Sequence, residues 1–158
     1  MKRAVDWDPG SPPFYHDLAM MQSLGGDTHG SLESLMTAIK LNPNEAEYYY
    51  KIGLAWNEAG DMNKAVAALR DAVKIQPRFA RAWYNLGLAL NAQKKPDEAL
   101  AALSEGAKAS PTDPMIPYAK ATILANLGRK EEARMEVFKV LNLAPGMPEA
   151  LQLRDALK

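Results

Sequence analysis

Residues 46–77 read AEYYYKIGLAWNEAGDMNKAVAALRDAVKIQP, and residues 80–111 read ARAWYNLGLALNAQKKPDEALAALSEGAKASP. The two stretches begin 34 residues apart and share an order of aromatic, aliphatic–glycine, small, leucine and proline positions. Five prolines keep the same 34-residue step along the chain, at Pro9, Pro43, Pro77, Pro111 and Pro145. A fixed period of this length indicates an array of one supersecondary unit.

Each unit is predicted to contain two helices. The closing proline ends one helix, because proline cannot extend a helix from its interior and restricts the residue before it. A second break lies midway, as at Gly60-Asp61, where a glycine past a helix end is followed by a capping aspartate. Between the breaks, apolar residues recur with a period near 3.6, as at Tyr49, Ile52 and Trp56, which favours amphipathic helices of roughly a dozen residues.

This pattern resembles the tetratricopeptide repeat, whose order is an aromatic, Leu-Gly, a second aromatic, a small residue, a large apolar residue and a closing proline. One unit carries it as Tyr49, Ile52-Gly53, Trp56, Ala65, Leu69 and Pro77, and the next as Trp83, Leu86-Gly87, Leu90, Ala99, Leu103 and Pro111. The outer units depart from it, with Gln22 at the second aromatic of the first and Lys120 at the leucine of the fourth. The resemblance implies an all-α fold, a right-handed α-solenoid of antiparallel helix pairs in a TPR-like superhelix.

We expect the whole chain, residues 1–158, to form a single array. It comprises a half unit 1–11, units 12–45, 46–79, 80–113 and 114–147, and a closing helix 148–158. Residues 2–8 resemble the second helix of a lost unit, so we expect the chain to be the C-terminal part of a longer protein. The alternative is a native start whose half repeat covers itself. Trp7 would lack a partner helix, which predicts head-to-tail association with another copy.

Composition excludes several classes of function. The chain has 19 basic and 19 acidic residues, so no overall field draws it to nucleic acid or an anionic membrane. It has no cysteine, which excludes disulfides, thiolate metal sites and cysteine catalysis. Asp6 and Asp8 interrupt any signal peptide, and no apolar run is long enough to span a membrane. We expect a soluble chain, in the cytoplasm or, as a fragment of an exported protein, in the periplasm.

The resemblance implies that partners bind in a concave groove lined by the first helix of each unit. The predicted groove residues are His16, Met20, Tyr50, Leu54, Asn57, Tyr84, Asn85, Leu88, Asn91, Tyr118 and Thr122. The tyrosines recur every 34 residues and would form a ladder that suits a peptide or helix, because tyrosine presents a large contact area at low entropic cost. The alternative is that this tyrosine position is ordinary for the family and serves stacking alone.

Two subtypes of the family do not match. Members that clamp a C-terminal carboxylate use lysines, asparagines and an arginine, whereas this chain keeps Asn85 but has Met115 and Ala119 at the expected basic pair. Members with an asparagine ladder have asparagine at places that read Asp17, Lys51, Asn85 and Ala119 in this chain. Neither chaperone-tail binding nor the asparagine-ladder function is therefore expected.

Catalysis is not expected either. The two histidines, His16 and His29, have no reason to converge, so neither a metal site nor a cofactor is predicted. His16 and Asp17 are neighbours on a helix and point about 100° apart, which makes them poor partners for base catalysis. We predict a non-catalytic scaffold for protein–protein interaction that binds a peptide, helix or protein in the groove. Two alternatives stay open: an accessory segment of a larger enzyme or multi-domain protein that positions substrate or subunits, and a self-association module.

Overall fold

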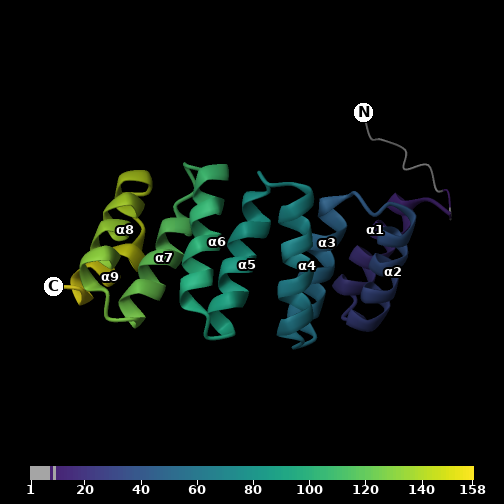
Figure 1. Ribbon diagram of the computed structural model, residues 1–158, viewed down its shortest axis with the longest axis horizontal. Coiled ribbons are helices and arrows are strands. Elements are labelled where there is room, and N and C mark those ends of the chain that lie inside the picture. Colours follow the sequence, from purple (N-terminus) through teal and green to yellow (C-terminus); the bar gives the residue numbers. More distant parts are fainter. Residues whose placement is uncertain (1–7, 9) are drawn as a thin grey trace. The chain divides into compact units, whose positions relative to one another are not determined.

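The computed structural model describes residues 8 and 10–158, and within this part of the chain all regular structure is helical (Figure 1). The helices in chain order are α1 (Pro12–Leu24), α2 (Thr28–Leu41), α3 (Ala46–Glu58), α4 (Met62–Ile75), α5 (Ala80–Ala92), α6 (Pro96–Ala109), α7 (Met115–Asn126), α8 (Lys130–Leu143) and α9 (Pro148–Ala156). The all-α repeat fold predicted from the sequence is confirmed. Trp7 and most of the predicted half unit lie outside the described residues, so those predictions stay predictions.

The turn inside each helix pair repeats in geometry even where its sequence changes. Gly26, Gly60 and Gly128 have φ between 73° and 82°, and Lys94 adopts φ 61° at the same place in the third pair. The helix after the turn is capped in the first two pairs. Asp61, for example, accepts a hydrogen bond from the Lys64 backbone nitrogen at 3.0 Å, and this bond holds the pKa of Asp61 below its ordinary value.

The two helices of a pair approach closely where a glycine faces a leucine. An added Cβ at Gly53 would lie 2.8 Å from Leu69 Cγ, and one at Gly87 would lie 2.6 Å from Leu103 Cγ. Leu69 is 2% exposed and Leu103 is fully buried, so each leucine fills the space that its glycine leaves. In the second and third pairs, a glycine on the first helix and a leucine on the second thus fit together.

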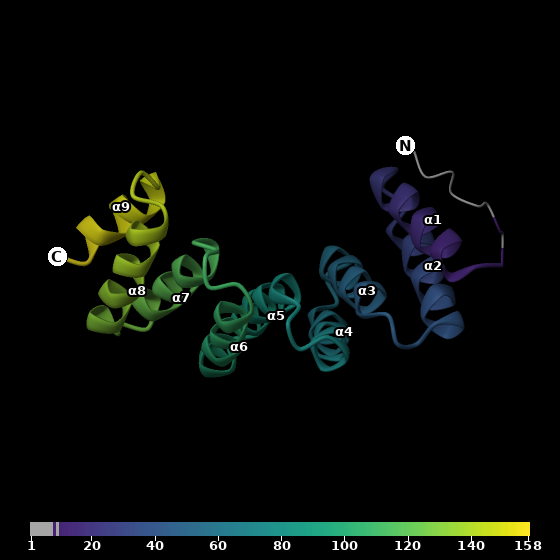
Figure 2. The same cartoon turned by 90° about the horizontal axis from the view of Figure 1, so that it is seen from above.

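The described chain forms two compact units, one ending at Gln76 and the other beginning at Pro77. The first unit holds α1 to α4, in which α2 packs on both α1 and α3. The second holds α5 to α9, in which α6 packs on α5 and α7, and α8 packs on α7 and α9 (Figure 2). At the end of α9 the Arg134 guanidinium of α8 donates to the Leu157 backbone oxygen.

Candidate binding surfaces

In the first unit, two of the predicted groove residues line one cavity. It has a volume of about 140 Å³ and lies between α1 and α3, with α2 as its floor. Met20 of α1, 37% exposed, and the half-buried Leu54 of α3 supply apolar walls, whereas Ser23, Lys51 and Glu58 supply polar groups. Apolar walls combined with a few polar groups are typical of sites that hold an apolar side chain of a partner.

The other predicted groove residues of the first unit differ in accessibility. Asn57 is exposed, whereas Tyr50 is only 7% exposed and has the Lys51 ammonium 5.9 Å from its ring centroid. His16 is half-buried and its ring centroid lies 5.5 Å from that of Tyr48. Tyr50 therefore exposes little of its ring to a partner, although it stands at the same repeat position as Tyr84 and Tyr118.

His16 Nδ1 lies 3.3 Å from Asp17 Oδ1, so the rotamers bring together two side chains that helix periodicity places about 100° apart. That they are poor partners for base catalysis stays a prediction. Among the described residues, His16 Nε2 is buried without a hydrogen-bond partner. Tyr48, whose ring lies beside that of His16, has the pKa of its hydroxyl raised by burial and then by the Glu45 and Asp17 carboxylates. A raised pKa keeps this hydroxyl protonated at neutral pH, the opposite of an activated nucleophile.

In the second unit, Tyr84 on α5 and Tyr118 on α7 are both half-buried, and Leu88 on α5 is 39% exposed. The side chain of Tyr84 is partly withdrawn from water, and this burial raises the pKa of its hydroxyl. The Asp113 carboxylate raises the pKa further, so the hydroxyl stays neutral. Two more predicted groove residues donate within their own helices: Asn85 Nδ2 to the Arg81 backbone oxygen at 2.9 Å, and Thr122 Oγ1 to the Tyr118 backbone oxygen at 3.0 Å. Asn91 is exposed.

A second surface of this unit holds a charged pair that sequence reasoning missed. Lys120 of α7 and Glu136 of α8 place Nζ and Oε1 2.9 Å apart, with side chains 16% and 10% exposed. The same Oε1 accepts a hydrogen bond from Lys139 Nζ at 2.9 Å. Glu136 thus receives two ammonium groups on one carboxylate oxygen.

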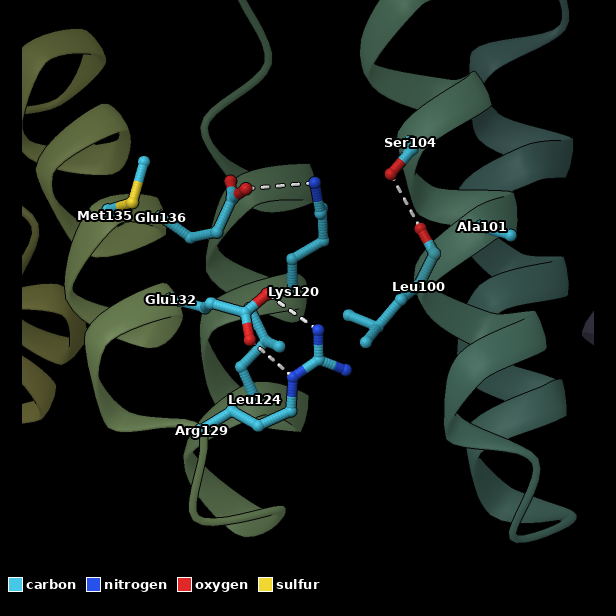
Figure 3. Close-up of a pocket in the computed structure, with 9 residues that line it drawn as sticks. All are labelled: Leu100, Ala101, Ser104, Lys120, Leu124, Arg129, Glu132, Met135 and Glu136. Atoms are coloured by element: carbon cyan, nitrogen blue, oxygen red, sulfur yellow. Dashed lines mark hydrogen bonds and ion pairs between the residues drawn. The ribbon is translucent and has the colours of Figure 1, made fainter.

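Two cavities flank this pair. The first, about 300 Å³, lies between α6 and α8 and is lined by Leu100, Ala101, Ser104, Lys120, Leu124, Arg129, Glu132, Met135 and Glu136 (Figure 3). The second, about 290 Å³, is lined by Ala107, Ser110, Pro111, Asp113, Pro117, Lys120, Glu136, Lys139, Asn142 and Leu143. Lys120 and Glu136 are the residues common to both linings. We call the two cavities together the α6–α8 groove.

The sequence contained a signal for this pair. Thirty-four residues earlier the positions of Lys120 and Glu136 hold Leu86 and Ala102, and another 34 residues earlier they hold Ile52 and Ala68. Both members of a contacting pair therefore change from apolar to charged in the same unit. Lys120 departs from the leucine position of the repeat pattern, and Glu136 departs from the small residue found at its position in the two preceding units.

Two kinds of feature are absent from the described residues: a metal-binding cluster and a membrane-spanning helix. Within residues 8 and 10–158 no cluster of three or more histidine and acidic side chains could hold a metal ion. None of the helices in this part of the chain is long and apolar enough to cross a bilayer.

The helix pairs, their glycine–leucine contacts and the repeated turn define a helical-repeat protein. A sequence profile of the tetratricopeptide repeat matches residues 25–78 and 58–114, which together exceed half of the chain. The chain belongs to the tetratricopeptide repeat family. No curated protein gives a significant sequence match.

Solved structures show the same fold. A MamA protein aligns with a TM-score of 0.86 at 23% identity, covering 92% of this chain and 80% of that chain. MamA from Desulfovibrio magneticus RS-1 aligns with a TM-score of 0.83 at 22% identity, covering 92% and 82%. YrrB, described as a TPR protein with an unusual peptide-binding site, aligns with a TM-score of 0.80 at 21% identity, covering 95% and 77%. At these identities the similarity shows the fold alone.

Proposed function

We propose that the chain is a non-catalytic scaffold that binds a peptide, helix or protein segment through its predicted groove residues. Membership of the tetratricopeptide repeat family supports a role in protein interaction in general. The observation that carries the finer proposal is the cavity between α1 and α3, which Met20 and Leu54 both line.

The chemistry of this cavity suits an apolar side chain of a partner. Met20 is flexible and polarisable, so it can adjust to partners of different shape. Leu54 adds a second apolar wall, and Lys51 and Glu58 provide charges of both signs around it. In interfaces of this kind, with apolar contacts at the centre and polar groups around them, a few residues contribute most of the free energy of binding.

The second unit supports the same proposal with a different set of groups. Tyr84 and Tyr118 present partly accessible rings on the first helices of their pairs, and Leu88 adds exposed apolar area. Tyrosine gives a partner a large, rigid contact surface together with a hydroxyl for hydrogen bonding. A peptide or amphipathic helix is the kind of ligand that these groups fit.

The test is affinity capture with mass spectrometry on the whole chain, repeated with Leu54→Glu and with Tyr84→Ala. We expect each variant to lose its specific partner by at least tenfold, because one places a charge in the apolar cavity and the other removes a contact ring. Met36→Glu is the matched control, since Met36 is 48% exposed on α2, a second helix. Circular dichroism verifies that all three variants fold.

Unchanged capture by both Leu54→Glu and Tyr84→Ala would contradict the proposed surface. The accessory role in a larger enzyme or multi-domain protein stays an alternative, which the identity of the captured partner distinguishes: a catalytic subunit or domain favours it. Self-association through Trp7 also stays a prediction, because that residue lies outside the described part of the chain.

A further inference from the structure

The α6–α8 groove contains a largely buried ion pair, Lys120 with Glu136, whose presence is not explained by its effect on stability. Its two cavities meet at Lys120 and Glu136, which are largely withdrawn from solvent. Replacing a buried ion pair with apolar residues of suitable volume is often neutral or stabilising, because desolvation offsets the attraction between the charges. The earlier units hold Leu86 with Ala102 and Ile52 with Ala68 at these positions. Two other units of the same chain therefore form their helix pairs with uncharged residues at these positions.

The charges at the junction of the cavities do not balance. Lys120 Nζ and Lys139 Nζ both lie 2.9 Å from Glu136 Oε1, so two ammonium groups share one carboxylate. The linings also contain Arg129 and Glu132, which pair with each other, and the Asp113 carboxylate, which lies in the second cavity. Arg129 donates twice to Glu132, at 2.7 and 2.6 Å, and Asp113 accepts from the Met115 backbone nitrogen at 2.9 Å.

Apolar walls stand on both sides of this positive junction. Leu100, Leu124 and Met135 line the first cavity, and Figure 3 shows Leu100 of α6 facing Lys120 and Glu136 across it. Pro117 and Leu143 line the second cavity. The two cavities, of about 300 and 290 Å³, are open on the surface formed by α6 and α8, from which side chains of a partner can enter.

We propose that the α6–α8 groove is a second peptide-binding site, which takes a segment carrying an acidic side chain next to a large apolar one. The carboxylate of the ligand binds Lys120 and Lys139, which share the single Glu136 carboxylate, while the apolar neighbour fills the first cavity beside Leu124 and Met135. This site lies between α6 and α8, with Pro117, Lys120 and Leu124 of α7 in its lining. None of its lining residues belongs to the predicted groove, so the two proposals can fail separately.

The probe is a displayed library of random short peptides, selected on the whole wild-type chain and in parallel on the double variant Lys120→Leu with Glu136→Ala. This variant restores the residue types of the earlier units, so it removes the charges without disturbing the repeat. We expect peptides specific to the wild type to carry Asp or Glu beside Leu, Met or Phe. Their affinity, measured by fluorescence anisotropy, falls at least tenfold in the double variant and is unchanged in Leu54→Glu.

Single variants test whether the lysines attract the acidic peptide and whether Glu136 opposes its binding. Lys120→Met lowers the affinity for the acidic peptide, whereas Glu136→Gln raises it, because the internal carboxylate no longer competes for the two lysines. Amide chemical shifts on binding change in α6 and α8 in the wild type. The proposal is overturned if no peptide specific to the wild type is selected, if the selected peptides are basic and weakened by Glu136→Gln, or if their shifts map to α5 and α7 alone.

Discussion

Gly87 shows how a single missing Cβ sets the distance between two helices. An added Cβ would lie 2.6 and 2.9 Å from two Leu103 carbons and 3.2 Å from the Ala99 backbone oxygen. Alanine improves helix propensity by about 1 kcal/mol over glycine, but overpacking a filled core costs about 1–3 kcal/mol. Because Leu103 is fully buried, we expect the overpacking cost to dominate and Gly87→Ala to lower the free energy of unfolding by up to about 2 kcal/mol in urea titrations.

Gly146 provides the control for this substitution. An added Cβ there meets no atom within 4 Å, and its φ lies outside the left-handed region. We expect Gly146→Ala to change the free energy of unfolding by less than about 0.5 kcal/mol. A stabilised Gly87→Ala variant would show that helix propensity outweighs the contact with Leu103.

At the scale of single residues, the sequence predicted packing contacts well but did not predict the directions of side chains. Gly53 and Gly87 stand at the glycine of the repeat pattern, and both pack as that pattern implies. The geometry of His16 was not foreseen, because helix periodicity gives the direction of Cβ but not the rotamer that brings Nδ1 to Asp17.

Between α7 and α8, the energetics of the Lys120–Glu136 pair are asymmetric. Removing Glu136 leaves Lys120 largely buried without its carboxylate, whereas removing Lys120 leaves Glu136 with Lys139. We expect Glu136→Ala to destabilise the chain by about 3 kcal/mol, and Lys120→Met to destabilise it by roughly 1 kcal/mol. Urea unfolding of the two single variants measures the difference.

The double variant Lys120→Leu with Glu136→Ala tests the charged pair as a whole. We expect it to be as stable as the wild type or more stable by about 1 kcal/mol, because it restores an apolar contact in place of a buried ion pair. If the double variant is as unstable as Glu136→Ala alone, then the charged pair is needed for folding and the argument for a binding role loses its basis.

At the scale of the whole molecule, stability is expected to be local, since in a repeat protein each helix pair contacts its sequence neighbours. Leu103 in the second unit is fully buried, and Leu69 in the first is 2% exposed. Truncating either leucine to alanine costs about 2–5 kcal/mol. We expect Leu103→Ala to raise hydrogen-exchange rates mainly in residues 77–158, and Leu69→Ala to raise them mainly in residues 1–76.

Hydrogen exchange is measured by mass spectrometry on both variants, and each variant serves as the control for the other. Equal loss of protection across both units in the two variants would mean that the chain unfolds as one cooperative body. That outcome would contradict the local stability expected of a repeat array.

The sequence by itself determined the helices, their pairing and the family, because the 34-residue period places stop signals, caps and glycine–leucine contacts at fixed offsets, and these are local or nearest-neighbour interactions. The tertiary structure decided which side chains are accessible. Tyr50 and Tyr84 share a repeat position, yet Tyr50 is buried and Tyr84 half-buried, because accessibility depends on the residues packed around each ring. It also decided that Lys120 meets Glu136, since contact between helices depends on packing and rotamers that no period along one chain specifies.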